Sequence, residues 1–395
     1  MWYTSPIAAD ADFLTVFFIL AEGPMKFTIE RAALLKSLSH VQNVVERRHT
    51  NPLLSNVKIT AKNDGIILNA TDNELEISEN TAAKVEKAGS VTASAHKLYE
   101  IVRKLPEGAE VEFSQNAEKG QLNISSGRAK FVLATMPGED FPTIADGEMT
   151  HKFVLPAQDL RDLIERTSFA VSTDETRYYL NGIYLHEAVS KEEKILRAVA
   201  TDGHRLACAE SALPEGASGM PGVIVPRKAI GELSKLLAEE SGDVKVALST
   251  YKIQFTFGDL VLTSLLIEGT YPDYERVIPL DNDKVLEVEA AALMAAVDRV
   301  AVVSEKSRAV RLSISKDLVV VSSANAEEGS ASDELEAKYD SESVEVGLNY
   351  VYLLDVLRQI KGGLARIAFL DSAAAILLTD MSDPAVLFVL MPMRV

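Results

Sequence analysis

The residues best suited to chemistry lie in one polar stretch, TDGHRL at residues 201–206, where Asp202 and His204 stand two positions apart. A carboxylate beside an imidazole can move protons, so general acid–base catalysis is one interpretation. A tight Asp-Gly hairpin turn with polar flanks is a second. A binding rim, in which His204 and Arg205 donate hydrogen bonds next to Leu206, is a third. We prefer the binding rim, and the sequence leaves the other two open.

Other signatures of catalysis or of a cofactor site do not occur in the sequence. It contains neither a glycine-rich phosphate loop nor a Gly-x-Ser-x-Gly elbow. Cys208 is the single cysteine and is typical of a small buried residue, so no intrachain disulfide and no thiolate metal cage can form. No two histidines stand at metal-ligand spacing: His40, His49, His96, His151, His186 and His204. We therefore predict a protein that has no metal and no cofactor.

The elements that must position these residues repeat three times along the chain. A short alternating strand that runs directly into an amphipathic helix begins at Lys26, at Lys152 and at Val285. Matching leucines stand in the three helices, namely Leu34, Leu160 and Leu293. Self-similarity at a long period indicates three copies of one domain, and 395 residues suit three domains of ordinary size.

Each copy continues with the same order of elements. Period-two alternation predicts antiparallel hairpins after the first helix, then a second helix with one apolar stripe, then further strands. The expected strands cover residues 56–60, 65–70, 109–113 and 129–133, then 182–186, 196–200, 243–247 and 252–257, then 310–314, 318–322, 365–369 and 386–390. The second apolar stripes run from Leu98 to Leu105, from Ile230 to Leu237 and from Val351 to Ile360. The predicted fold class is α+β, with two helices packed on antiparallel sheets of about eight strands in each domain.

Proline-containing segments end the first two copies, FPTI at residues 141–144 and YPDYERVIP at residues 271–279. We expect these prolines to stop the last strand and to open a linker. The predicted domains are residues 25–149, 150–282 and 283–395.

Residues 1–24 lie outside the repeat. Their apolar run at residues 13–21 has no basic residue before it, which is unlike a signal peptide. We interpret the extension as translation from an upstream start codon or as added sequence, with a genuine extra segment as the alternative.

The distribution of charge bears on nucleic-acid binding. A formal net charge of −18 argues against a protein that coats nucleic acid by charge alone. Basic residues nevertheless gather around the second helices: Lys97, Arg103, Lys104, Arg227, Lys228, Lys235, Arg358 and Lys361. An ordinary solvated helix face explains this pattern equally well. If these helices faced one shared space, that space would hold phosphate weakly and without sequence preference.

Six motifs resemble those of one protein family: LPEGAE at 105–110, RYYLNG at 177–182, ATDGHRL at 200–206, VPRK at 225–228, YPDYERV at 271–277 and VLMPMRV at 389–395. The chain over residues 25–395 resembles the β subunit of bacterial DNA polymerase III, the sliding-clamp family. The resemblance implies a head-to-tail homodimer, closed into a ring of six similar domains with helices lining the hole. Duplex DNA would thread the hole without sequence preference, and a separate ATP-driven loader would open the ring. It also implies a non-catalytic protein that holds the replicative polymerase, the loader and other partners through a clamp-binding peptide. The single cysteine suits a reducing, cytoplasmic location.

The same resemblance assigns roles to residues, position by position. It implies a peptide pocket between the second and third domains with an apolar floor, formed by Leu180, Leu206, Pro272, Val277, Val389 and Met391. The residues that would frame the pocket are Thr201, Gly203, His204, Arg205, Arg276, Pro392, Met393 and Arg394. The residues that would face DNA are Arg48, Arg103, Tyr178 and Tyr179. The loop STDET at residues 172–176 departs from the family in its acidity, which argues against strong DNA contact there.

Charge also predicts how two chains would meet. A basic alternating strand lies at the edge of the first domain, and an acidic stretch lies in the third domain. Edge strands need pairing or protection, so we expect these two edges to pair between subunits. The residues expected at this contact are Arg128, Lys130, Val302, Val303, Glu334 and Glu336.

Two rival interpretations come from other classes of protein. One is a three-domain adaptor that never meets DNA, and the other is an enzyme with a site at residues 201–206. A closed dimer would separate a clamp from an adaptor, because an adaptor need not close. Loss of a turnover on His204→Ala would identify an enzyme.

Overall fold

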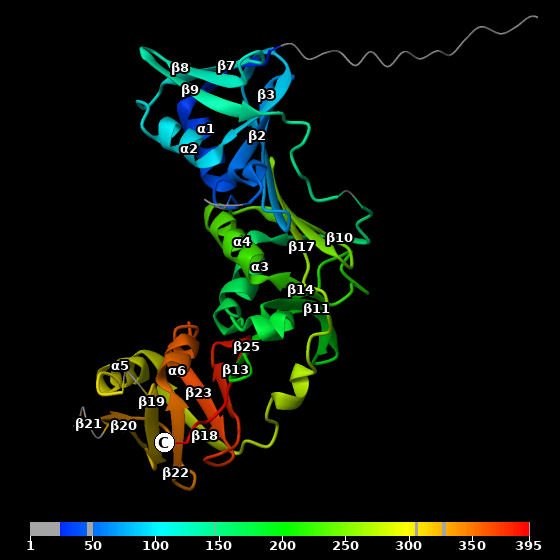
Figure 1. The fold of residues 1–395 in the computed structure, drawn as a ribbon. Helices are drawn as coiled ribbons and strands as arrows, with labels where there is room; N and C mark the ends of the chain where they lie inside the picture. The colour runs from blue at the N-terminus through cyan, green and yellow to red at the C-terminus, as the bar shows by residue number, and fades with distance from the viewer. Residues whose placement is uncertain (1–23, 46–49, 146, 305–306, 326–328, 395) are drawn as a thin grey trace, which may run out of the picture.

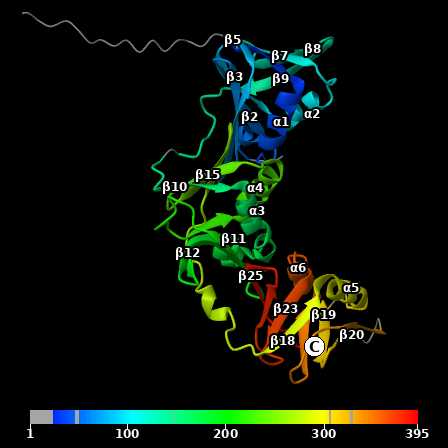
Figure 2. The ribbon, with the colours of Figure 1, turned by 180° about the vertical axis from the view of Figure 1, so that it is seen from behind.

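The computed structural model describes residues 24–45, 50–145, 147–304, 307–325 and 329–394. Three similar domains follow one another as an open crescent, coloured from blue at one end to red at the other (Figure 1). In both views the helices lie toward the concave side of the crescent and the sheets toward the convex side (Figure 2). Residues 1–23 of the extension, and Arg48, lie outside the described residues.

The first domain begins with β1 (Lys26–Glu30), which runs directly into α1 (Arg31–Val41). The Glu30 carboxylate accepts a hydrogen bond from the Ala33 amide and so caps the first turn of α1. The remaining elements are η1 (Pro52–Ser55), β2 (Asn56–Lys62), β3 (Gly65–Thr71), β4 (Leu75–Ala82), β5 (Lys84–Lys87), β6 (Gly89–Ser94), α2 (Ala95–Arg103), β7 (Glu110–Asn116), β8 (Gln121–Ser126) and β9 (Ala129–Met136).

The second and third domains repeat this order. The second contains β10 (His151–Pro156), α3 (Ala157–Glu165), η2 (Ser168–Ala170), η3 (Glu175–Leu180), β11 (Gly182–Ser190), β12 (Glu193–Thr201), β13 (Arg205–Ala212), β14 (Val223–Pro226), α4 (Arg227–Glu239), β15 (Asp243–Leu248), β16 (Lys252–Phe257), β17 (Leu260–Leu265) and η4 (Tyr274–Val277). The third contains β18 (Lys284–Glu289), α5 (Ala290–Ala301), β19 (Ala309–Ser315), β20 (Leu318–Asn325), β21 (Gly329–Glu336), β22 (Val344–Asn349), α6 (Tyr350–Leu357), β23 (Leu364–Phe369), β24 (Ile376–Asp380) and β25 (Asp383–Leu390).

The predicted α+β class is confirmed: in the described part of the chain each domain has two α-helices, and the paired strands are antiparallel. Two details of the prediction are wrong. Leu105 and Ile360 are buried but lie beyond the ends of α2 and α6. The last strands of the first two domains end at Met136 and Leu265, so the later prolines lie in linkers and stop no strand.

Two sheets continue across the domain junctions. β17 of the second domain pairs with β4 of the first, where Leu262 lies opposite Ile77. β13 of the second domain pairs with β25 of the third, where Leu206 lies opposite Val389. Backbone hydrogen bonds therefore tie each domain to the next, in addition to the packing of side chains.

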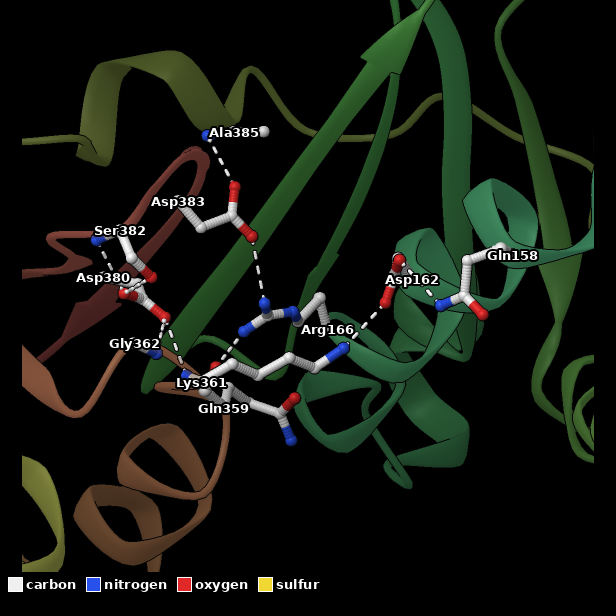
Figure 3. A network of polar contacts seen from close by, with 10 residues as sticks. All are labelled: Gln158, Asp162, Arg166, Gln359, Lys361, Gly362, Asp380, Ser382, Asp383 and Ala385. Atoms are coloured by element: carbon white, nitrogen blue, oxygen red, sulfur yellow. Dashed lines mark hydrogen bonds and ion pairs between the residues drawn. The ribbon is translucent and has the colours of Figure 1, made fainter.

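A polar network reinforces the junction of the second and third domains (Figure 3). Arg166 follows α3 and is only 3% exposed. It donates to the Asp383 carboxylate at 2.9 Å and to the Gln359 carbonyl, both in the third domain. Lys361 reaches back from the third domain to Asp162 on α3 at 2.7 Å. A buried guanidinium must keep its partners, so this network opposes separation of the two domains.

His40 ties the first domain to the second. Its Nδ1 lies 2.8 Å from a Glu79 oxygen on β4, and its Nε2 lies 3.3 Å from a Glu239 oxygen at the end of α4. Both ring nitrogens face carboxylates, so the doubly protonated ring satisfies both contacts. Burial lowers the pKa of His40, but the hydrogen bonds and charges of the two carboxylates outweigh burial and leave the pKa raised.

We expect the stabilising contribution of His40 to decline as the pH rises. A histidine whose pKa is raised on folding stabilises the fold fully below its unfolded pKa of about 6.5. The contribution is lost as the pH rises through the higher folded pKa. His40→Gln should therefore lower the melting temperature more at about pH 6 than at about pH 9.

Thermal denaturation of His151→Gln supplies the control, because His151 forms no ion pair among the described residues. Its effect on the melting temperature should not follow this trend. An effect of His40→Gln that is equal at both pH values would contradict the expectation.

Candidate peptide pocket and subunit edges

An apolar cluster lies at the junction of the second and third domains, apart from the main core. Leu180, Leu206 and Val389 belong to it and are at most 4% exposed. Because Leu206 and Val389 pair across the junction, both domains contribute to the cluster. The structure thus brings three of the predicted floor residues together, but it leaves almost none of their surface exposed.

Apolar surface that a partner could reach lies around this cluster. Val277, at the end of η4, is 48% exposed, and Met391, just after β25, is 45% exposed. Pro272 is exposed as well. Ile278 packs against the cluster, and the Met391 amide donates to the His204 carbonyl at 2.9 Å. Exposed apolar side chains around a buried apolar floor are suited to a short peptide with an apolar end.

Residues 201–206 form a tight hairpin turn between β12 and β13. Gly203 has a φ of 88°, and a Cβ added there would meet the Arg177 guanidinium at 2.6 Å. The Thr201 hydroxyl donates to the Arg205 carbonyl at 2.6 Å and so closes the turn. The structural-turn interpretation therefore describes the backbone of this stretch.

The charged side chains of the turn have partners within the chain. The Asp202 carboxylate accepts from the Arg205 amide and from its Nε, both at 3.1 Å. The Nη1 and Nη2 atoms of Arg205 donate to the Asp355 carboxylate and to the Phe169 carbonyl, each at 2.6 Å. Its guanidinium also lies over the Tyr352 ring at 4.3 Å. Arg205 links the second domain to the third, and Asp202 is not placed as a free proton acceptor.

His204 is the member of this turn that stays at the surface. Its side chain is exposed, and its ring lies parallel to the Tyr352 ring with 6.2 Å between centroids. Its carbonyl holds the C-terminal segment through Met391. His204 can therefore contact a partner at the rim without breaking a link between the domains.

The three residues after Met391 leave the junction. They line a hollow in the third domain together with Arg311 and Glu345. Met393, the middle one of the three, is held there because its amide donates to the Gly347 carbonyl at 2.9 Å. These predicted frame residues are Pro392, Met393 and Arg394. The structure thus divides the predicted C-terminal group between two places.

The linker between the second and third domains contains two buried tyrosines that the sequence reasoning missed. Tyr271 and Tyr274 belong to the junction cluster, whereas Arg276 is exposed and donates to Asp273 at 2.6 Å. Both tyrosines belong to the YPDYERV motif, which was the usable signal, although only Tyr274 lies within η4.

The residues predicted to face DNA differ in accessibility. Tyr178 is exposed, whereas Tyr179 is half-buried against the junction cluster, and their rings meet edge to face at 5.8 Å. Arg103 is exposed at the end of α2 and donates to a carboxylate three residues earlier at 2.8 Å. In the acidic loop at residues 172–176, hydrogen bonds from Thr176 and Arg177 lower the pKa of Asp174 to about 2. That loop therefore keeps a negative charge beside the tyrosines.

β9 lies at one end of the crescent and β21 at the other (Figure 1), and each of these strands has one edge that is largely unpaired among the described strands. β9 pairs with β8, and with β6 only through Thr135 and Met136. Among the described strands β21 pairs with β20 alone. Lys130 on β9 is exposed, as are Glu334 and Glu336 on β21. The other predicted contact residues are Arg128, in the turn before β9, and Val302 and Val303, just after α5.

Three similar α+β domains in a crescent, with helices on the concave side and open strand edges at both ends, define the class of DNA clamps. Three family models match successive parts of the chain: the N-terminal domain of the DNA polymerase III beta subunit at residues 25–145, its central domain at residues 154–273 and its C-terminal domain at residues 275–394. The chain belongs to the DNA polymerase III beta subunit family. Because this subunit is not catalytic, the prediction that the chain is not an enzyme is confirmed.

Relatives and solved structures agree with this assignment. The beta sliding clamp of Caulobacter vibrioides is 48% identical over 372 residues, which is 94% of this chain and 100% of that protein. The beta sliding clamp of Escherichia coli K12 is 37% identical over 374 residues, again 94% of this chain and all of that protein. The crystal structure of the Caulobacter crescentus clamp superposes with a TM-score of 0.93 at 48% identity, covering 95% of this chain and 100% of that one. A Bartonella birtlesii clamp bound to griselimycin gives a TM-score of 0.91 at 47% identity, covering 94% and 100%.

Two further observations concern other kinds of site. Among the described residues, no group of three or more His, Cys, Asp or Glu side chains is arranged to hold a metal ion. None of the helices that the structure describes is long and apolar enough to cross a membrane.

Proposed function

We propose that two copies of this chain close head to tail into a ring of six domains that encircles duplex DNA. In this proposal residues 25–149, 150–282 and 283–395 are the three domains of each copy. The protein is a DNA polymerase processivity clamp of the beta sliding clamp type, working in the cytoplasm. The observation that carries the proposal is the pair of open strand edges at opposite ends of the crescent, one basic and one acidic. A head-to-tail contact of this kind forms a ring when its rotation closes.

The concave side supports weak contact with the DNA backbone. The basic residues of the second helices are exposed, and several are already paired within the chain. Lys235 pairs with Glu232 at 2.7 Å, and Arg358 pairs with Asp355 at 2.8 Å. Such pairs leave little net positive charge for phosphates, so the ring would hold DNA by enclosing it rather than by affinity.

The junction cluster supports a second role, the capture of partner proteins. A short peptide with an apolar end would place that end between Val277 and Met391, above the floor of Leu206 and Val389. His204 would face the polar part of the peptide. Replicative polymerase and clamp loader could then share one site through the same kind of peptide.

Charge reversal on β21 tests ring closure. Glu334→Lys/Glu336→Lys places lysines opposite Arg128 and Lys130 of the partner copy, and like charges across an interface oppose association. We expect the dissociation constant of the dimer to rise by about tenfold or more, which corresponds to a loss of at least about 1.4 kcal/mol of binding free energy. Sedimentation equilibrium of the wild-type chain should give twice the chain mass of 42.9 kDa.

A matched control changes the same charge elsewhere in the third domain. Asp340→Lys/Glu342→Lys alters two exposed acids at the same spacing but away from the edge, and should leave the dimer intact. Adding Arg128→Glu/Lys130→Glu to the β21 variant should restore association. A monomeric wild-type chain at micromolar concentration would instead favour the adaptor interpretation.

The function as a clamp is tested by retention on circular and linear DNA. A clamp is held by topology, whereas an adaptor or a charge-bound protein behaves alike on both forms.

A further inference from the structure

Two buried tyrosines fix the linker segment that carries part of the proposed peptide pocket. Tyr271 and Tyr274 are each at most 7% exposed. They flank the exposed Pro272 and precede the exposed Val277. The segment contains one short turn, η4, and no strand, so its position depends on what the tyrosines contact.

Tyr271 is held by ring stacking. Its ring lies 4.7 Å from that of Tyr184 with an angle of 5° between planes. Tyr184 stacks in turn on His186, two residues along β11, with 4.5 Å between centroids. Alternate residues of a strand share one face, so β11 presents a two-ring surface to the linker. Tyr271 also belongs to the cluster that contains the pocket floor.

Tyr274 is held by a chain of hydrogen bonds whose directions can be assigned. His186 Nδ1 lies 2.8 Å from the Glu187 carbonyl, which only accepts, so Nδ1 carries the proton. Burial lowers the pKa of His186, so the neutral ring leaves Nε2 as an acceptor. The Tyr274 hydroxyl donates to Nε2 at 3.0 Å and accepts from Arg197 Nη1 at 3.0 Å.

Arg197 in turn is fixed by carboxylates. It donates to Glu210 on β13 at 2.7 Å and to Glu275 on η4 itself at 2.9 Å. The polar chain therefore runs from the sheet of the second domain to η4 without an unpaired member among these groups. Two of its members, Tyr274 and Glu275, lie in the same short turn as the exposed Val277.

We infer that His186 and Tyr274 are positioning residues, which hold η4 so that Val277 and Pro272 form one wall of the peptide pocket before any peptide arrives. This inference rests on the proposed function of the junction cluster. A wall that is already ordered loses little conformational entropy on binding, so the anchor should raise peptide affinity without touching the peptide.

Two substitutions that remove hydrogen bonds from the anchor test this inference. In Tyr274→Phe the ring stays buried, but Arg197 loses an acceptor and His186 loses its donor. In His186→Leu the acceptor for Tyr274 is removed. Each variant should weaken binding of a labelled ten-residue peptide that ends in Leu-Phe by about tenfold, the loss of one buried hydrogen bond. His186→Gln, which can again accept from Tyr274, should restore part of the affinity.

Hydrogen–deuterium exchange separates positioning from a general loss of stability. In Tyr274→Phe, faster exchange should be confined to residues 271–278, with an unchanged dimer mass and only a small decrease in melting temperature. Tyr251→Phe, at a tyrosine of the same domain outside this chain of contacts, should change neither exchange nor affinity.

Two outcomes would overturn the inference while the pocket itself stands. One is unchanged peptide affinity in Tyr274→Phe and His186→Leu, when the wild-type protein binds the peptide. The other is faster exchange throughout β11, β12 and β13 with a lower melting temperature, which would show a structural role only. If the wild-type protein fails to bind the peptide, that result contradicts the proposed pocket and, with it, this inference.

Discussion

Protein that a clamp loader has placed on nicked circular DNA is expected to stay on the circle in high salt and to leave almost completely once the circle is cut. The basic residues of the second helices are largely paired with carboxylates of the same chain, so few remain for phosphates. Affinity for open duplex should then be that of ordinary non-specific binding, with a Kd of about 10⁻⁴ to 10⁻⁶ M at physiological salt. A closed ring needs no higher affinity for DNA, because it can leave the DNA only at a free end or through an opened subunit interface.

Gel filtration of labelled protein with a nicked plasmid, before and after cleavage by a restriction enzyme, measures this retention. The salt concentration should be high enough to screen phosphate contacts. The β21 variant Glu334→Lys/Glu336→Lys should be lost even from circles, whereas Asp340→Lys/Glu342→Lys should be retained like the wild-type protein. Salt-resistant retention that is equal on circular and linear DNA would exclude a topological clamp.

Removal of residues 391–395 is expected to weaken peptide binding by more than tenfold while the dimer persists. Met391 is among the exposed apolar side chains at the junction of the second and third domains. At ~25 cal/mol per Å², the loss of ~100 Å² of apolar contact corresponds to roughly 2.5 kcal/mol. The edges that we propose to close the ring, β9 and β21, are formed by other parts of the chain.

A point variant separates the side chain from the backbone in this experiment. The deletion also removes the hydrogen bond from the Met391 amide to the His204 carbonyl, whereas Met391→Ala keeps it. Met381→Ala is a matched control, because Met381 is exposed to 48% in the same domain but lies between β24 and β25, away from the junction cluster. Fluorescence anisotropy should show weaker binding for Met391→Ala and no change for Met381→Ala. Unchanged affinity of both the deletion and Met391→Ala, with the dimer intact, would show that the pocket is misplaced.

The local pattern of apolar and polar residues was enough to predict much of the fold. Alternation around residues 56–70 predicted β2 and β3, and the stripe from Ile230 to Leu237 predicted the buried face of α4. Such patterns record which side of an element is buried, and this depends on residues two to four positions apart. The three copies and the α+β class could therefore be read directly, and the family motifs extended this reading to function.

Only the tertiary structure decided which of the predicted site residues stay accessible. Sequence placed Leu206, Arg205 and Met391 in one group, yet the structure buries the first, pairs the second with Asp355 and leaves the third exposed. It also brought His186 within hydrogen-bond distance of Tyr274, 88 positions further along the chain. Strand pairing between β13 and β25 and contacts of this kind join residues far apart in sequence. Periodicity contains no information on such partners, because they are selected by the packing of whole elements against one another.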